Sequence, residues 1–207
     1  MIILNKVNGA DEILFKYASK VQSDFKMPLT AVLMGIAYGG EVEEIAKIWK
    51  DRGEVYGYDT FEDLHPGHLF KGGEEHAYEK DCMGHWYKRK GYGTEKLAYD
   101  YQRNQLDEQG LDNAILIKGE VHKDSCKDLK KIHLAFLDMD MVESMDAGYN
   151  AVKDKIVKGG YLCLHDVIPA NHIPRLYHHF QVIINDKSMW KVVDKNDDAY
   201  MVVLQKI

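Results

Sequence analysis

Two short apolar runs that each end in ionisable residues constrain the fold of this chain more than any other feature. Asp138 and Asp140 follow the run 132–137, and His165 and Asp166 follow the run 161–164. Each run has the length and composition of a buried strand. In an open parallel sheet, ligands bind at the carboxyl ends of the strands. Two neighbouring strands of this kind would bring carboxylates and an imidazole into one crevice, which suits a divalent-metal site beside an acid/base group.

The rest of the chain alternates between strand-like and helix-like patterns. We expect helices over 11–25, 41–50, 94–109, 122–131, 144–157 and 174–184, and strands over 30–36, 55–58, 114–118, 132–137, 161–164, 190–193 and 199–204. Strands that alternate with helices indicate βαβ units and a parallel sheet, and the last two strands are typical of a hairpin. The predicted fold is α/β, a Rossmann-like sheet of about seven strands, mostly parallel with one antiparallel strand, with helices on both faces. Gly159 and Gly160 are expected to form the turn before the strand at 161.

The composition is that of an ordinary globular protein. The 207 residues, 45% of them hydrophobic, are enough for a single domain over 1–207. A net charge of −6 argues against nucleic-acid binding, and neither a membrane-spanning run nor a secretory signal is expected. Three scattered cysteines without a CxxC pair suit a reducing cytoplasm. We expect a cytoplasmic protein whose partner is a small molecule, with no nucleic-acid or membrane partner; a homo-oligomer is left open.

One segment, at about 62–93, breaks the alternation. It is rich in histidine and glycine and has no clean periodicity. A long irregular segment inside a compact domain is typical of a functional lid. Aromatic and basic residues over 86–90 suit either an anionic part of a substrate or a solvated surface.

A glycine-containing turn follows the first predicted strand. Gly35, Ala37, Tyr38, Gly39 and Gly40 lie in this turn, before the predicted helix at 41. Glycines let the backbone approach a ligand, and the helix N-terminus favours polar or anionic groups. The dinucleotide pattern G-x-G-x-x-G is absent because position 37 is alanine, which argues against a nicotinamide cofactor.

An acidic residue, Asp59, ends the second predicted strand. An acidic residue in this place typically accepts hydrogen bonds from ribose hydroxyls, although Asp59 also suits a cap for the turn that begins at Thr60. Together with the glycine turn it favours a ligand that contains a nucleoside. Gly119 and Glu120, which follow the third strand, would then lie near the base.

In order and spacing, these motifs resemble the macrocin O-methyltransferase family. The resemblance covers about residues 30–170 and rests on the segments 35–40, 55–64, 118–120, 137–144, 159–161 and 165–166. The most specific segments are Asp-Thr-Phe-Glu at 59–62 and Leu-Asp-x-Asp-x-x-x-Ser at 137–144. The family consists of class I O-methyltransferases that use S-adenosylmethionine and a divalent metal to methylate sugar hydroxyls on natural products.

The resemblance implies a role for each matching residue. Asp138 would be a metal ligand and Asp140 a general base, so both are candidate catalytic residues. The metal would lower the pKa of the acceptor hydroxyl while Asp140 takes the proton. The metal set would be Asp138, His165 and Asp166. The cofactor set would be Gly35, Ala37, Tyr38, Gly39, Gly40, Asp59, Thr60, Phe61, Gly119, Glu120 and Asp138.

The chain also departs from the family. The family's last strand ends in two acidic residues, whereas this chain has His165 before Asp166; imidazole suits manganese, iron, nickel or zinc better than magnesium, so Mg versus Mn is left open. Leu33 replaces an acidic residue, and Tyr38 stands where an arginine is common. Met141 occupies the position of the lysine in catechol-type enzymes, so a lysine base is excluded there.

Three alternative functions remain open. They are an NAD-linked oxidoreductase or epimerase, a metal-dependent hydrolase, and a non-catalytic nucleoside-binding module on the same fold. Fold does not fix the substrate, so the acceptor could be a sugar, a polyketide, a phenol or a nucleotide-sugar.

Overall fold

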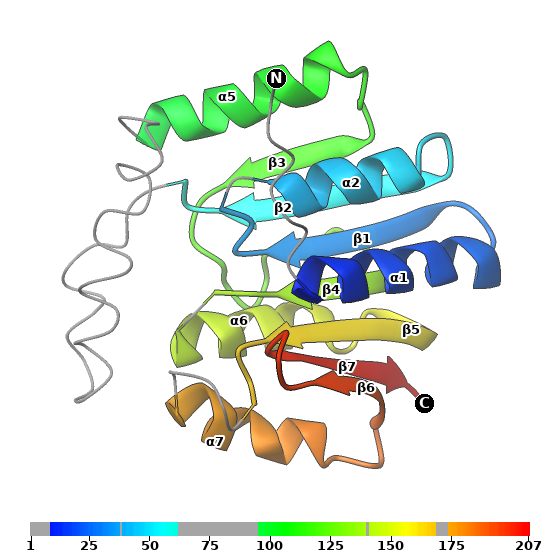
Figure 1. Ribbon diagram of the computed structural model, residues 1–207, viewed down its shortest axis with the longest axis vertical. Coiled ribbons are helices and arrows are strands. Elements are labelled where there is room, and N and C mark those ends of the chain that lie inside the picture. Colours follow the sequence, from blue (N-terminus) through cyan, green and yellow to red (C-terminus); the bar gives the residue numbers. More distant parts are fainter. Residues whose placement is uncertain (1–8, 38, 62–94, 140, 169–173) are drawn as a thin grey trace.

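The computed structural model describes residues 9–37, 39–61, 95–139, 141–168 and 174–207. They form a seven-stranded sheet in the order β3-β2-β1-β4-β5-β7-β6 (Figure 1). The strands are β1 Leu29–Met34, β2 Gly53–Asp59, β3 Ala114–Lys118, β4 Ile132–Leu137, β5 Ile156–His165, β6 Trp190–Asn196 and β7 Met201–Lys206. Strands β1 to β5 pair in parallel, and β7 is antiparallel to both β5 and β6. The predicted mostly parallel sheet with one antiparallel strand is confirmed.

Helices cover both faces of this sheet. They are α1 Gly9–Asp24, α2 Gly40–Ile48, α5 Glu95–Glu108, α6 Val142–Val152 and α7 Pro174–Ile184. Helices α1, α2 and α5 share one apolar cluster with the sheet, and α6 and α7 share the other (Figure 1). Along β1, Leu33 faces the first cluster and Met34 the second, because successive strand residues point to opposite faces. None of the described helices is long and apolar enough to cross a bilayer.

Two predicted elements differ in the structure. The segment 122–131 is a series of turns and not a helix. Its backbone bonds span three residues, as from Ser125 N–H to His122 C=O, and the Ser125 hydroxyl accepts the His122 N–H. A segment this short is a poor helix in water, and a serine side chain that takes a backbone donor weakens it further.

The second difference concerns Gly159 and Gly160, which lie within β5 and not in a turn before it. Helix α6 ends at Val152, earlier than expected, and β5 begins at Ile156. Strand β5 advances from Ile156 to Tyr161 while β4 advances only from Ile132 to Leu134, so the glycines lie in an irregularity of a longer strand. Gly159 has a φ of 83°, which glycine adopts without strain.

The strand order places a topological switch point between β1 and β4. From β1 the chain builds β2 and β3 toward one side, and β4 and β5 lie toward the other. Gly35, directly after β1, lies against Asp138, directly after β4: a Cβ on Gly35 would be 1.9 Å from the Asp138 carbonyl oxygen. Ligands of open α/β sheets bind outside the carboxyl ends of the strands at such a point. The fold therefore places the glycine turn and the strand-end acids at one edge.

Candidate active site

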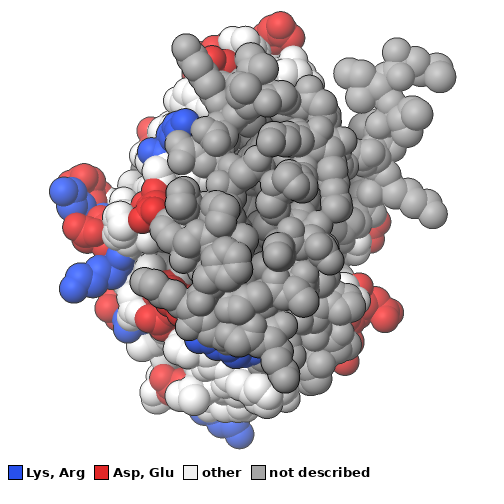
Figure 2. Space-filling view, turned by 90° about the vertical axis from the view of Figure 1, so that its left-hand side faces the viewer, with Lys and Arg blue, Asp and Glu red and all other residues white. Residues whose placement is uncertain are grey.

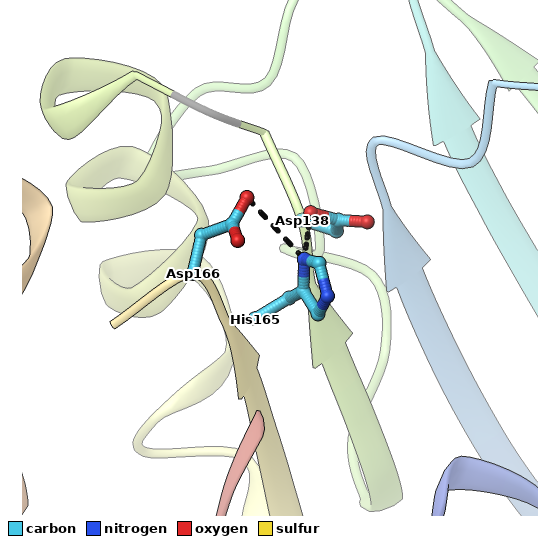
Figure 3. A group of neighbouring side chains, drawn as sticks. All are labelled: Asp138, His165 and Asp166. Atoms are coloured by element: carbon cyan, nitrogen blue, oxygen red, sulfur yellow. Dashed lines mark hydrogen bonds and ion pairs between the residues drawn. The ribbon is translucent and has the colours of Figure 1, made fainter. Parts of the chain in front are cut away.

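Asp138, His165 and Asp166 form one cluster at this edge of the sheet. Leu137 of β4 is paired with Leu164 of β5, so the residues that follow them lie side by side. His165 Nδ1 lies 2.9 Å from Asp138 Oδ1 and 3.4 Å from Asp166 Oδ2, and Figure 3 shows the two carboxylates on either side of the imidazole nitrogen. All three side chains are partly buried. The structure thus brings together the three residues that were predicted as metal ligands.

A local backbone feature turns Asp166 toward the cluster. Consecutive residues of a regular strand point to opposite faces, so His165 and Asp166 would ordinarily diverge. Asp166 instead has a φ of 61°, in the left-handed region, and its N–H donates to the Tyr200 carbonyl at 2.8 Å. This conformation is uncommon for a residue with a side chain and is frequent at functional sites. It allows both side chains to face the same space.

The cluster holds His165 in its protonated form. Burial by itself would lower the pKa of His165, but the charge and hydrogen bond of Asp138, followed by those of Asp166, outweigh burial and raise it to about 11. The imidazolium balances part of the negative charge of the two carboxylates. The cluster is therefore a compact, partly buried ionic group.

This pairing predicts a titration that NMR can follow in the metal-free protein. The folded pKa of His165 lies above its ordinary value of 6.5, so its contribution to stability is complete below about pH 6.5 and is lost as the pH rises toward 11. We expect both ring nitrogens to stay protonated at pH 8 in ¹⁵N-detected imidazole spectra, with the signal assigned through its loss in His165→Gln. A midpoint near 6.5 would contradict the ionic cluster.

The donor set fits a divalent ion. One imidazole nitrogen and two carboxylate oxygens lie within 4.8 Å of one another, which matches the spacing of ligand atoms around a first-row transition metal. The nitrogen that would bind the ion, Nδ1, is the one that now contacts both carboxylates. Binding would therefore displace its proton.

Asp59 joins the two loops beside the cluster. One carboxylate oxygen accepts the Ala37 N–H at 2.8 Å and the other accepts the Phe61 N–H at 2.7 Å. The turn-capping role considered for Asp59 is thus present in the structure. Its main-chain carbonyl also accepts the Gly119 N–H at 2.9 Å, so Asp59 links the loops after β1, β2 and β3.

The other predicted cofactor residues occupy different environments. Phe61 is buried and its ring packs against Tyr99 with centroids 5.1 Å apart, so its side chain belongs to the core. Gly119 and Glu120 follow β3, beyond β2 from the glycine turn, and are exposed. Thr60, between Asp59 and Phe61, is partly buried. Tyr38 and Asp140, together with the expected lid at about 62–93, lie outside the described residues, so their roles stay predictions.

Two residues that the sequence patterns did not single out also lie at this edge. Gln102 of α5 is buried and donates through Nε2 to the Ala37 carbonyl, while its Oε1 has no hydrogen-bond partner among the described residues. Glu41 stands in the first turn of α2. Burial raises its pKa to about 7, a hydrogen bond from its own backbone N–H acts against this rise, and the charges of Asp11 and Asp138 add to it. Neither residue stands in a strand-end motif. The one signal that could have indicated them is a polar side chain at a helix position that the apolar periodicity assigns to the buried face.

His133, in contrast, belongs to the core. It is 6% exposed, and its Nδ1 accepts the Thr30 N–H at 3.1 Å. Its ring meets that of Phe25 edge to face, and burial lowers the pKa of His133. Its ring therefore serves the packing of the core and the hydrogen bonding of β1.

Figure 2 views the molecule from the side toward which the parallel strands run. Among the described residues visible there, both acidic and basic side chains lie around the rim. The described part of this face is therefore of mixed charge.

No protein-family model matches the chain, and no curated protein matches it. Several solved structures, however, resemble the chain in their fold. The O-methyltransferase NovP is 15% identical with a TM-score of 0.67, over 95% of this chain and 78% of that one. CalS11, a calicheamicin methyltransferase, is 14% identical with a TM-score of 0.63, over 95% and 77%. An rRNA methylase from Streptococcus thermophilus is 13% identical with a TM-score of 0.60, over 99% of both chains. The chain thus has the Rossmann-like fold of class I methyltransferases.

Proposed function

We propose that the protein transfers a methyl group from S-adenosylmethionine to a hydroxyl of a small molecule with the help of a divalent cation. The observation that carries the proposal is the contact of Gly35 with Asp138 at the switch point. This contact puts a loop suited to a nucleoside ligand directly beside a cluster suited to a metal. The structural likeness to methyltransferases that act on different substrates supports the reaction class.

The chain's own residues have distinct tasks in this proposal. The main-chain amides of the glycine turn and the carboxylate of Asp59 would hold the amino-acid and ribose parts of the methyl donor. Asp138, His165 and Asp166 would hold the cation, which when bound would lower the pKa of the acceptor hydroxyl. Asp140 would accept the proton of the hydroxyl. Holding the donor beside the acceptor would increase the rate of methyl transfer by a large factor, because intramolecular model reactions reach effective molarities of ~10⁵ M or more.

We further propose that the acceptor is a sugar or a glycosylated natural product. CalS11 is a TDP-rhamnose 3′-O-methyltransferase, and the motif resemblance points the same way. The net charge of −6 disfavours an RNA substrate, although an rRNA methylase shares the fold. An acceptor screen of sugars, phenols and nucleotide-sugars, read by the formation of S-adenosylhomocysteine, would decide among these.

The first test is calorimetric titration of S-adenosylmethionine and S-adenosylhomocysteine, each with and without Mg²⁺ or Mn²⁺. We expect micromolar binding of both ligands. NAD serves as the control, and its tighter binding would favour an oxidoreductase instead. Absence of binding to a folded protein would overturn the methyltransferase proposal.

A substitution at Asp59 tests the nucleoside end of the site. Asp59→Asn keeps the shape but removes one of the two oxygens that accept the Ala37 and Phe61 N–H groups. We expect affinity for S-adenosylhomocysteine to fall about 10-fold or more, because a charged acceptor is lost and the loop shifts. Affinity for Mn²⁺, read by electron paramagnetic resonance, should not change. Glu54→Gln, near the opposite end of β2, is the matched control; equal affinities in the two variants would exclude a ribose role for Asp59.

A further inference from the structure

Ala37, in the glycine turn after β1, is held at both its N–H and its carbonyl by side chains from distant elements. Its N–H donates to Asp59 Oδ2 at 2.8 Å, and its carbonyl accepts from Gln102 Nε2. Asp59 ends β2, and Gln102 lies in the middle of α5. Among the described residues, Ala37 has no other hydrogen-bond partner. The conformation of Ala37 therefore depends on two groups that are far from it in the chain.

The two residues whose N–H groups Asp59 accepts have an uncommon backbone conformation. Ala37 has a φ of 45° and Phe61 a φ of 53°, in the left-handed region that residues with a side chain rarely adopt. Such conformations persist only where the surrounding structure enforces them, and they cluster at ligand-binding sites. The bonds to Asp59 fix the N–H of each residue but not the carbonyl that follows it. A second support is needed on the carbonyl side.

Helix α5 contacts both of these loops. Gln102 donates to the carbonyl of Ala37. Tyr99 stands three residues earlier, on the same face of the helix, and packs its ring against Phe61 with centroids 5.1 Å apart. The contacts form a closed ring that runs from Asp59 to Ala37, through α5 to Phe61, and back to Asp59. The loops after β1 and β2 are therefore joined twice, once by Asp59 and once by α5.

Helix α5 is itself fixed to the sheet, so it can support a loop. It lies beside β3, which is an edge strand (Figure 1). Arg103 Nη1 donates to the Ala114 carbonyl of β3 at 2.9 Å, and Leu106 is buried in the apolar cluster that α5 shares with α1 and α2. A side chain on a helix anchored in this way is held more precisely than a side chain on a loop.

Gln102 contacts the glycine turn at the expense of its own hydrogen bonding. It is 4% exposed, and its Oε1 has no hydrogen-bond partner among the described residues. The amide also lies against Gly39, where a Cβ would be 2.9 Å from Gln102 Cδ. Turning the amide by 180° would only bring Oε1 against the Ala37 carbonyl, which is another acceptor. A buried acceptor without a donor destabilises a fold. The contact with Ala37 explains why a polar side chain lies here.

We propose that Gln102 is a positioning residue that holds the glycine turn in its ligand-binding conformation. The inference rests on the proposed function and deepens it. Gln102 fixes the direction of the Ala37 carbonyl while Asp59 fixes the N–H of the same residue. Gln102 does not have to touch the methyl donor for this. It keeps the turn ordered before the ligand arrives, so that binding does not lose free energy to ordering the turn.

The first test separates positioning from folding. Gln102→Met keeps the length of the side chain but removes both the donor to Ala37 and the unsatisfied acceptor. We expect affinity for S-adenosylhomocysteine in calorimetric titration to fall about 10-fold, because a loose turn must be ordered on binding. The midpoint of chemical denaturation should stay the same or rise, since removal of the buried acceptor offsets the lost hydrogen bond. Unchanged affinity in a folded Gln102→Met would overturn the proposal.

The matched control for this variant lies in the next turn of the same helix. Gln105 donates to Glu108 at 3.3 Å on the exposed surface. Gln105→Met removes the same kind of side chain from α5 without touching the glycine turn, so affinity for S-adenosylhomocysteine should not change. An equal fall in both variants would mean that any change in α5 weakens binding, and it would overturn the role of Gln102.

A rescue experiment gives a readout that a purely structural role would not move. Ala37→Gly relieves the strain of the left-handed φ, because glycine adopts this region readily. If Gln102 acts by holding Ala37 in this conformation, Ala37→Gly should raise the affinity of Gln102→Met for S-adenosylhomocysteine by about 3-fold or more. The same substitution in the wild-type background should not raise it. The same effect in both backgrounds would mean that the two residues act independently, against the proposal.

Hydrogen exchange of the main-chain amides tests the same point without a ligand. In Gln102→Met, the Ala37 N–H should exchange about 10-fold faster than in the wild type, because a free carbonyl loosens the bond to Asp59. The N–H of Leu33, within β1, is the internal reference and should not change. Unchanged protection of Ala37 would overturn the proposal. If exchange is faster but the wild-type protein binds no S-adenosylhomocysteine, the proposed function fails while the positioning role of Gln102 stands.

Discussion

Asp138→Asn is expected to abolish metal-stimulated activity, with a loss on the order of 100-fold or more. Asp138 contributes the closest contact of the cluster, 2.9 Å from His165 Nδ1, and the largest effect that keeps His165 charged. An amide in its place is neutral and is a poor ligand for a hard cation. Mn²⁺ affinity should fall with activity, while affinity for S-adenosylhomocysteine should remain close to that of the wild type.

The chain provides a matched control for this variant. Asp146 forms a second aspartate–histidine pair, 3.1 Å from His179 Nε2, on the exposed surface between α6 and α7. Asp146→Asn removes the same kind of contact away from the strand ends, so activity and Mn²⁺ affinity should stay at the wild-type level. If Asp138→Asn keeps full metal stimulation, the cluster is not the cation site of the protein.

Gly35→Ala is expected to be the most destabilising of the glycine-to-alanine substitutions in the glycine turn. The added Cβ would lie 1.9 Å from the carbonyl oxygen of Asp138 and 2.6 Å from its carbonyl carbon, and both are backbone atoms that cannot rotate away. Gly35 also has a φ of 82°, which costs a residue with a side chain about 1 kcal/mol or more. Together these terms predict a loss of about 3 kcal/mol or more in the free energy of unfolding.

Chemical denaturation of three variants separates the two terms. Gly110→Ala places a side chain at a φ of 61° with nothing within 4 Å, so it measures backbone strain alone. Gly40→Ala adds a Cβ in open space without a positive φ and should be nearly neutral or slightly stabilising. Gly35→Ala should therefore cost clearly more than Gly110→Ala. Equal losses would mean that the turn does not pack against Asp138 as closely as the structure indicates.

The predicted strands and helices were correct where the sequence carries a periodic signal. The strands at 114–118 and 132–137 begin and end where expected, and the helix at 174–184 does too. Errors arose where local signals conflict with packing. Gly159 and Gly160 are typical turn residues, yet they lie within β5, in the irregularity between Ile156 and Tyr161, two residues that pair with β4. A local pattern does not contain the partner strand, so it cannot reveal this outcome.

In the candidate site, too, local patterns predicted one part and packing decided the rest. Strand-end placement alone predicted that Asp138, His165 and Asp166 meet, because β4 and β5 are consecutive strands of one parallel sheet. The left-handed φ of Asp166, which aims its carboxylate at His165, depends on the pairing of Asp166 with Tyr200 in the hairpin that follows much later in the chain. No pattern around position 166 encodes that contact.

The sequence by itself determined which residues stand at strand ends, since alternation and apolar runs follow from backbone geometry and burial. Tertiary structure decided which of these side chains meet. The contact of Gln102 with the turn after β1 and the charges that act on Glu41 both join elements that are distant in the chain. The physical reason is that hydrophobic patterning fixes which face of an element is buried. Which buried faces meet, and which polar groups then lack partners, follows only from packing all the elements at once.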